Sequence, residues 1–230
     1  MRGIALCALA LLMCAEMAPG QSWEFVTSGD TEGWWAAHAV SGLSVSNGCL
    51  VGDITGSDPY IVGPRYPDID ADANHYVLLR MKINSGDTAE FFWGTAAQPW
   101  HVAGREVAFP IVADNEFHEY VVDLSVNSLW SGSVNTLRLD PGNGPSGRFE
   151  VDYIRVLSSG PPALAVYGPS VVNRFACQGE ATTVRARVAN AGYSPAENVL
   201  ATLSASGLTV LSAQPSPVSS IAPGEEVTFT

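Results

Sequence analysis

Residues 75–83 read HYVLLRMKI, and this stretch gives the clearest indication of the fold. Apolar and polar residues largely alternate along it, with a period of two. That period is typical of a β-strand with one face in a core and the other in water. The expected core face carries Val77, Leu79, Met81 and Ile83, and the expected outer face carries Tyr76, Arg80 and Lys82.

Similar short runs recur along the chain between turn residues, and no stretch of ten or more residues keeps a helical apolar period. We therefore expect an all-β protein, with a jelly-roll β-sandwich followed by an incomplete immunoglobulin-like β-sandwich. The strands predicted for the first sandwich are Trp23–Val26, Ser41–Val45, Cys49–Ile54, Tyr60–Val62, His75–Ile83, Thr88–Gly94, Arg105–Ile111, Phe117–Leu124, Thr136–Leu139 and Arg148–Leu157. Those predicted for the second are Ala163–Tyr167, Thr182–Ala189, Asn198–Ser204, Leu208–Leu211 and Glu226–Thr230.

The first 20 residues have the pattern of a secretory signal peptide. A positive start, Met1-Arg2, precedes an apolar run from Ile4 to Ala15, and Ala18-Pro19-Gly20 ends the segment with small residues. The run is shorter than the ~20 residues that a membrane-spanning helix needs. We expect cleavage before Gln21, a secreted or cell-surface protein, and no membrane insertion.

The rest of the chain divides at a short segment rich in Ser, Gly and Pro. All six tryptophans and all four histidines precede residue 131. Ser158-Ser159-Gly160-Pro161-Pro162 follows, which is typical of a linker. The predicted domains are 21–157 and 165–230, with a linker at 158–164. The sequence stops within the last predicted strand, so we expect a fragment of a longer, multidomain protein.

Composition excludes several classes of function. The chain of 230 residues has a net charge of -12 from 11 basic and 23 acidic residues. Without basic clusters it is unsuited to nucleic acid or anionic membrane surfaces. Hydrophobic residues make up 47% of it, which is too high for a disordered acidic tail.

An aromatic cluster is the strongest functional signal. Phe91-Phe92-Trp93-Gly94 and Gln98-Pro99-Trp100-His101 lie close together in the sequence. A tryptophan beside Gly and Pro offers a flat apolar surface for a sugar ring, and nearby polar groups can bind the hydroxyls. Two interpretations of Trp93 stay open, core residue or sugar platform, whereas Trp100 is expected to be exposed. Of Trp34 and Trp35, we expect one in the core.

Motifs for catalysis and metal binding are weak. The histidines form no zinc pattern, and there is no nucleophile elbow or phosphate-binding loop. Asp68–Asn74 has the oxygen spacing of a calcium loop but lacks the glycine and glutamate of an EF-hand, so a polar turn is favoured over a calcium site. Cys49 and Cys177 remain after signal cleavage, in different predicted domains, and a bridge between them is not favoured.

Residues 22–157 resemble the jelly-roll carbohydrate-binding modules of the galactose-binding-like type. The segments that carry the resemblance are Trp23–Phe25, Asp30–Trp34, Gly52–Tyr60, Ile69–Ala71, Tyr76–Lys82, Phe92-Trp93, His118–Tyr120, Leu137–Pro141 and Val151–Arg155. Such modules accompany secreted bacterial glycoside hydrolases, lyases and sulfatases. They often hold a structural calcium ion between their terminal strands, and this resemblance makes Glu24 and Asp152 the metal candidates.

Residues 163–230 resemble the CARDB-type immunoglobulin-like domain of bacterial surface and secreted proteins. Val184–Gly192 matches its strand and Asn-x-Gly turn, and Ile221–Phe229 matches its Pro-Gly turn into a late strand. The resemblance implies a role in spacing or adhesion.

Together these features predict a non-catalytic region that binds a polysaccharide and spaces domains of a secreted bacterial protein. Its sugar site would comprise Trp93, Trp100, His101, Arg80 and Arg138. One alternative is a structural or adhesion module that binds no sugar. Another is a polysaccharide lyase using Tyr120, His101 and Arg138. Paired carboxylates of a glycosidase, chosen from Glu90, Glu106, Glu119 and Asp140, are a weaker option. The glycan and the oligomeric state stay open.

Overall fold

The computed structural model describes residues 6–12, 21–65, 67–171, 182–205 and 217–230. The chain forms two compact units, residues 18–160 and residues 161–230 together with 1–17. The division falls within the linker predicted at 158–164. Almost all regular structure is β, so the predicted all-β fold class is confirmed.

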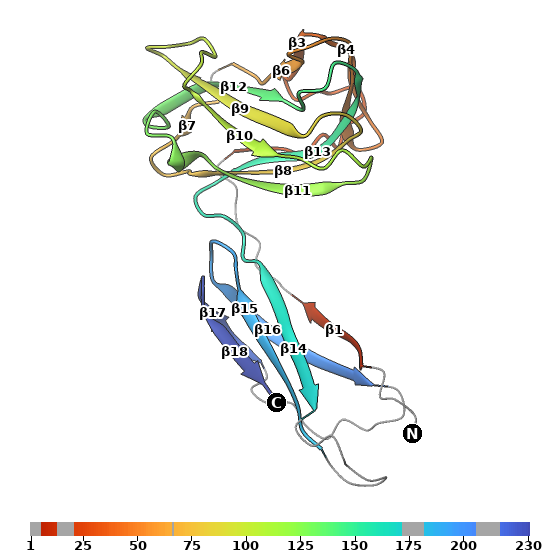
Figure 1. Ribbon diagram of the computed structural model, residues 1–230. Helices are drawn as coiled ribbons and strands as arrows, with labels where there is room; N and C mark the ends of the chain where they lie inside the picture. Colours follow the sequence, from red (N-terminus) through yellow and green to blue (C-terminus); the bar gives the residue numbers. More distant parts are fainter. Residues whose placement is uncertain (1–5, 13–20, 66, 172–181, 206–216) are drawn as a thin grey trace. The chain divides into compact units, whose positions relative to one another are not determined.

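The first unit is a sandwich of two antiparallel sheets (Figure 1). Sheet 1 has the strand order β10-β9-β12-β6-β3, and β7 also pairs with β12. Its strands are β3 (Trp35–His38), β6 (Tyr60–Val62), β7 (Ile69–Asp70), β9 (Thr88–Thr95), β10 (Glu106–Pro110) and β12 (Ser133–Asp140).

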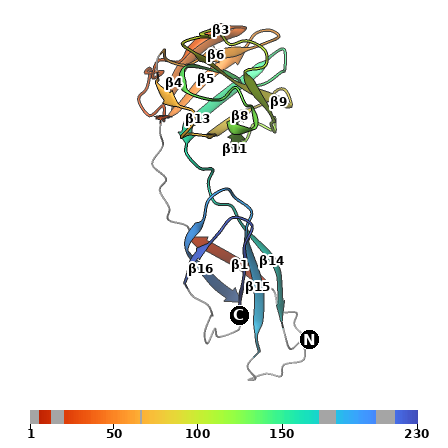
Figure 2. The ribbon, with the colours of Figure 1, turned by 90° about the vertical axis from the view of Figure 1, so that its left-hand side faces the viewer.

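Sheet 2 has the order β11-β8-β13-β5-β4, and β2 also pairs with β13. Figure 2 shows β4, β5, β13 and β8 side by side. Its strands are β2 (Gln21–Trp23), β4 (Val40–Ser46), β5 (Cys49–Ile54), β8 (Tyr76–Ile83), β11 (His118–Asp123) and β13 (Gly147–Leu157), and a single 3-10 turn, η1 (Leu124–Val126), follows β11.

The core between the sheets follows from the alternation in the sequence. Val77, Leu79, Met81 and Ile83 of β8 are all buried in it, as predicted from residues 75–83. The strand predictions for β5 and β6 match the structure residue for residue. Strands β3 and β7 were not predicted from the sequence. The alternation of apolar and polar residues is too weak in β3, Trp-Ala-Ala-His, and β7 has only two residues.

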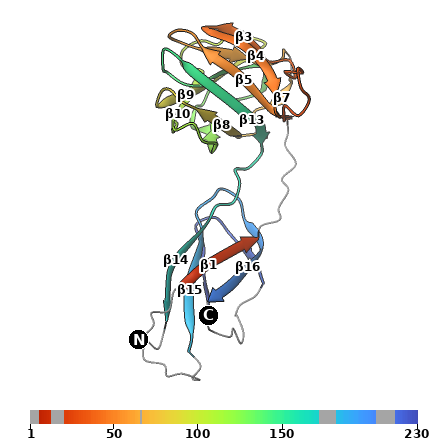
Figure 3. The ribbon, with the colours of Figure 1, turned by 90° about the vertical axis from the view of Figure 1, so that its right-hand side faces the viewer.

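The second unit contains two three-stranded sheets, β14-β15-β18 and β1-β16-β17. The predicted signal segment contributes a strand here, because β1 pairs with β16 (Figure 3). The predicted strand Leu208–Leu211 lies outside the described residues, and β17 was not predicted. The strands are β1 (Leu6–Leu12), β14 (Leu164–Val171), β15 (Val184–Asn190), β16 (Ala196–Ala205), β17 (Val218–Ile221) and β18 (Glu226–Phe229).

A buried amide holds the Asn-x-Gly turn of the second unit. The Asn190 side chain is buried, and its Oδ1 accepts from the backbone N–H groups of Ala163 and Gly192. Its Nδ2 donates to the carbonyl oxygens of Ser194 and Ile221. Four hydrogen bonds satisfy this amide, so one side chain joins the ends of β15 and β17 to the start of β14.

Candidate functional site

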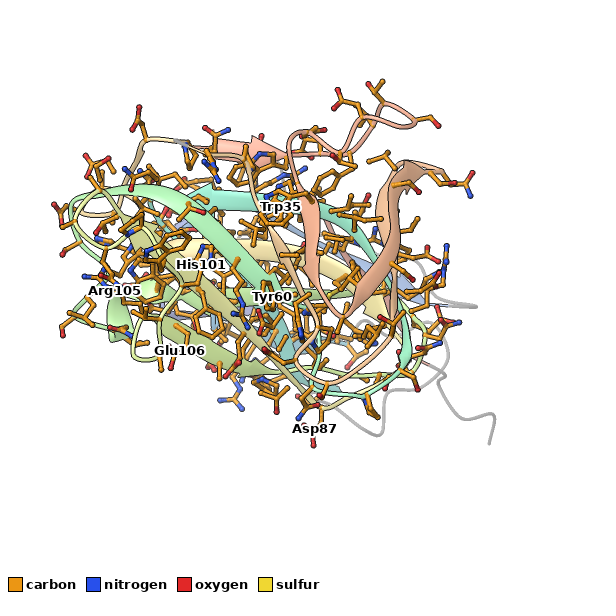
Figure 4. The ribbon with its side chains drawn as sticks, turned by 90° about the horizontal axis from the view of Figure 1, so that it is seen from above. Trp35, Tyr60, Asp87, His101, Arg105 and Glu106 are labelled. Atoms are coloured by element: carbon orange, nitrogen blue, oxygen red, sulfur yellow. The ribbon has the colours of Figure 1, made fainter. Side chains whose placement is uncertain are left out.

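The outer face of sheet 1 and its adjoining loop carry two exposed tryptophans, Trp35 and Trp100, which makes this face the candidate ligand site. Along β9, Phe91 and Trp93 point into the core, so Glu90 and Phe92, which alternate with them, point outward. The same alternation on β12 buries Leu137 and Leu139 and turns Arg138 outward. Seen from above in Figure 4, Trp35, Tyr60 and His101 lie over this face.

Cross-strand pairing aligns one residue from each strand in a row across the face. Trp35 pairs with Val62, and Val62 pairs with Arg138. Arg138 pairs in turn with Phe92, which pairs with Glu106. Neighbouring strands lie about 4.8 Å apart, so the row spans about 19 Å. Antiparallel pairing thus brings together residues that are distant in the sequence.

Arg138 is the fixed centre of this row. Its Nε donates to Asp140 Oδ1 at 2.6 Å, and its Nη2 donates to Asp140 Oδ2 at 2.5 Å and to Asp58 Oδ1 at 2.9 Å. The guanidinium lies 3.6 Å from the ring centroid of Tyr60 and 4.5 Å from that of Phe92. Bidentate carboxylate bonds and ring stacking are the arrangement that arginine favours. This side chain therefore has a single well-defined orientation.

Asp140 is even more buried than its partner Arg138. The side chains of Arg138 and Asp140 are 12% and 8% exposed. Burial raises the pKa of the Asp140 carboxyl to about 6, although its hydrogen bonds to Arg138 act in the opposite direction. At neutral pH the pair is ionised and mutually neutralising.

Two tryptophans present open ring surfaces near this centre. Trp35, at the start of β3, is 49% exposed, and Trp100, on the loop after β9, is 73% exposed. The Tyr60 ring stacks on His38, with 5.6 Å between centroids and 19° between planes. The exposure predicted for Trp100 is confirmed, and of the pair Trp34 and Trp35 it is Trp34 that lies in the core.

The loop that carries Trp100 is held close to the sheet. Thr95 N donates to Gln98 O at 2.9 Å, and Gln98 N donates to Thr95 O at 3.1 Å. A Cβ atom at Gly94 would lie 2.6 Å from Thr136 Cγ2 and 3.1 Å from the Gln98 carbonyl oxygen. Only glycine allows this close approach without displacement of a neighbour.

His101 belongs to the same face, as the sequence predicts. Its Nε2 and Thr136 Oγ1 share a hydrogen bond of 3.2 Å. Burial, and then the charge of Arg138, lower the pKa of His101 to about 4, so the ring is neutral at pH 7. It can exchange hydrogen bonds with a ligand but carries no charge to it.

A small polar pocket lies at the other end of the face. It has a volume of about 240 Å³, and its lining includes Asp58, Thr88, Glu90, Asp140 and Asn143. Glu90 and Asp140 are cross-strand neighbours on β9 and β12. Because Asp140 is engaged by Arg138, these two carboxylates do not form a free acid–base pair of the glycosidase type.

The structure corrects the interpretation of Trp93 as a sugar platform. Its ring is buried, its Nε1 donates to Leu129 O at 3.1 Å, and it meets Trp130 edge-on with 5.2 Å between centroids. The reason is its position in β9, where Phe92 points outward and Trp93 therefore points into the core. The core interpretation is confirmed.

Arg80 also lies away from the site. It belongs to β8 in sheet 2, where it forms an ion pair with Asp152 and lies 4.5 Å from the ring centroid of Phe117. Its strand neighbours Leu79 and Met81 fill the core, so Arg80 points to the outer face of sheet 2. The expectation that Arg80 and Arg138 share one site is wrong.

Asp152 lies on β13 and Glu24 directly follows β2, which pairs with β13, but each carboxylate is held by an arginine. Glu24 accepts two hydrogen bonds from Arg155, at 2.8 and 2.7 Å, and Asp152 pairs with Arg80. Among the described residues, no group of three or more His, Cys, Asp or Glu is placed to hold a metal ion. In this arrangement Glu24 and Asp152 do not fit a shared calcium site, and calcium binding stays a prediction.

The lyase residues are not brought together. Tyr120 belongs to β11 in sheet 2, its ring packs against the core, and its hydroxyl accepts from Val112 N at 3.1 Å. His101 and Arg138 lie at the outer face of sheet 1.

Cys49 is buried as a free thiol, and Cys177 lies outside the described residues. In the part of the chain that is described, no helix is long and apolar enough to cross a membrane.

Sequence reasoning missed Trp35, Tyr60 and Asp58 as site residues. Tyr60 begins a strand that was predicted correctly, and its alternation with buried Ile61 already placed it on the outer face. Trp35 is on the unrecognised strand β3. Asp58 gave no signal, because its contact with Arg138 joins residues 80 positions apart.

Comparisons with known proteins add only distant structural similarities. No family model matches the chain, and no curated protein matches it. The apo form of CBM1 of BiXyn10A aligns with 60% of this chain and 97% of its own, at a TM-score of 0.43 and 10% identity. A carbohydrate-binding module of family 29 aligns with 65% of this chain and 90% of its own, at 0.39 and 11%. A mutant of module CBM29-2 complexed with mannohexaose aligns with 65% and 91%, at 0.42 and 12%. Scores at this level are too low to assign a function, so the functional proposal depends on the geometry of sheet 1.

Proposed function

We propose that the outer face of sheet 1 binds a polysaccharide without chemically altering it. The observation that carries this proposal is the fixed Arg138 between the rings of Tyr60 and Phe92, in one cross-strand row with exposed Trp35. Aromatic planes stack on the apolar C–H faces of sugar rings, and fixed polar groups bind the hydroxyls. An open face of this kind suits an extended chain.

Each group on the face has a defined role in the proposal. Trp35 and Trp100 supply stacking surfaces on the sheet and on the adjoining loop. Arg138 donates hydrogen bonds to hydroxyl groups, neutral His101 donates or accepts them, and the pocket beside Glu90 holds the next polar part of the polysaccharide. No catalytic acid, base or nucleophile is required, so the unit would act as a non-catalytic binding module.

The test is titration against a panel of polysaccharides, followed by calorimetry and tryptophan fluorescence. We expect a dissociation constant between about micromolar and millimolar. Trp35→Ala and Trp100→Ala should each weaken binding by about five- to tenfold, because a stacked ring contributes about 1 kcal/mol. Val126→Ala is the matched control, because this side chain is 71% exposed but lies in η1. No heat and no fluorescence change with any polysaccharide would refute the proposal, and a structural or adhesion module would then be the better description.

The proposal includes export from a bacterial cell, with residues 1–20 as the signal peptide and the second unit as a CARDB-like spacer. The pairing of β1 with β16 gives Leu6–Leu12 a competing role as a strand. N-terminal sequencing of the exported protein decides between them. A start at Gln21 supports the signal peptide, and a start at Met1 supports the strand.

A further inference from the structure

The outer face of sheet 1 carries more negative than positive charge. Strands β9, β10 and β12 contribute Glu90, Glu106 and Asp140, and Asp58 contacts the same arginine as Asp140. With one arginine, Arg138, and four carboxylates, these five residues carry a net charge of −3 at neutral pH. His101 adds no charge there, since its pKa is lowered to about 4. Arg105 lies just before β10, at the rim, where its Nη1 donates to Leu129 O.

Arg138 is poorly placed to bind a carboxylate of a ligand. Its Nε and Nη2 already donate to Asp140 and Asp58, and its faces contact the rings of Tyr60 and Phe92. A ligand carboxylate would have to compete with two carboxylates that are in place before it arrives. The positive charge of Arg138 is therefore already neutralised within the protein. A neutral hydroxyl group of a ligand would not have to compete with these two carboxylates.

Glu106 adds a second, independent observation. Its Oε2 is buried and has no hydrogen-bond partner among the described residues. A buried acceptor without a donor is energetically unfavourable. Glu106 ends the same cross-strand row as Trp35 and Arg138. No hydrogen bond to a described residue offsets the charge at this oxygen, and a ligand carboxylate would bring another acceptor and another negative charge to the face.

We propose that this face accepts uncharged glycans and rejects those built from uronic acids, with Glu90 and Glu106 as the residues that discriminate. The proposal rests on the proposed function and specifies the substrate class of the same site. A uronate oligomer brings one carboxylate per sugar against an excess of carboxylates. The repulsion is screened by salt, so the discrimination should depend on ionic strength.

The experiment compares oligosaccharides that differ only at C6. Cellohexaose is matched with the hexamer of β-1,4-glucuronate, and β-1,4-mannohexaose with the hexamer of β-1,4-mannuronate. In each pair that binds, we expect the full chain to prefer the neutral member by at least about tenfold near 0.01 M salt, where the Debye length is about 30 Å, and by much less at 1 M, where it is about 3 Å.

Charge variants identify the residues responsible. Glu90→Gln with Glu106→Gln removes two charges from the face but keeps carbonyl acceptors, so the preference should fall severalfold. Asp53→Asn with Glu119→Gln is the matched control, because both residues belong to sheet 2 and the charge change is equal. This control should leave the preference unchanged.

The outcomes separate the two proposals. Equal or tighter binding of a uronate hexamer overturns the inference and leaves polysaccharide binding standing. Rejection that ignores both salt and the Glu90 and Glu106 variants also overturns it, since exclusion by shape would then be the cause. Failure of every neutral and acidic glycan overturns the proposed function itself.

Discussion

Replacement of Arg138 by methionine tests whether the centre of the candidate site is also a structural element of the sandwich. Arg138→Met keeps most of the side-chain volume but removes three hydrogen bonds of 2.5–2.9 Å to Asp140 and Asp58. It leaves the Asp140 carboxylate, which is 8% exposed, without its counterion. Removing one partner of a buried ion pair costs about 3–5 kcal/mol. We expect a loss of that size in the free energy of unfolding at pH 8.

A second substitution separates the lost pair from lost packing. In the Arg138→Met background, Asp140→Asn removes the uncompensated charge, so the double variant should recover about 2 kcal/mol or more. The deficit of Arg138→Met alone should also shrink as the pH falls from 8 to 6. Burial already raises the pKa of Asp140 to about 6 with the arginine present, and loss of the arginine raises it further. A raised carboxyl pKa in the folded state adds stability as the pH falls, by up to about 1.4 kcal/mol per pH unit.

The assay is urea unfolding monitored by tryptophan fluorescence. All six tryptophans lie between Trp23 and Trp130, so the signal reports the first unit only. Two results would refute the reasoning. One is a loss below about 1 kcal/mol for Arg138→Met, which would show that Asp140 finds water or another donor. The other is a double variant no more stable than the single one.

Three further predictions concern the surroundings of the site and the second unit. The pKa of His101 in the folded state is lowered from 6.5 to about 4, so the protein should lose up to about 3 kcal/mol of stability as the pH falls from 6.5 to 4. Urea unfolding at several pH values should show a smaller loss for His101→Gln. Gly94→Ala should destabilise the first unit by about 1–3 kcal/mol through its clash with Thr136 Cγ2, and adding Thr136→Ser should recover part of this in the same assay; no recovery would place the strain elsewhere. Asn190→Ala should cost more than about 2 kcal/mol, because four backbone groups lose their partner and the bonds to Ser194 O and Ile221 O are buried. Amide exchange in residues 182–205 should then become faster with unchanged tryptophan fluorescence, whereas unchanged exchange would contradict the prediction.

Much of the first unit could be predicted because its strands alternate clearly. The period of two in residues 75–83 correctly placed Val77, Leu79, Met81 and Ile83 in the core. The same rule, applied to residues 91–93, allowed Trp93 to be core, and the structure confirms that interpretation. Alternation is a local property, so it predicts which face a residue takes within its own strand.

The site was predicted only in part because it is assembled by pairing between distant strands. Arg138, His101 and the exposure of Trp100 were found from the sequence. Two of the contacts that orient Arg138 come from Asp58 and Tyr60, about 80 residues earlier, and no local sequence pattern indicates them. Arg80 was misplaced for the same reason, since alternation cannot tell which of two sheets a strand will join.

The contacts of Arg138 have a consequence for the thermodynamics of binding. An arginine side chain loses up to about 2 kcal/mol of conformational entropy when it is immobilised. Here that loss is incurred on folding, through Asp140, Asp58 and the ring of Tyr60, and not when a ligand arrives. Trp100, on its exposed loop, has no comparable restraint from burial. The entropic penalty of binding should therefore arise mainly from the ligand and from the Trp100 loop. In calorimetry, Asp58→Ala should make the binding entropy less favourable, and Trp100→Ala should make it more favourable.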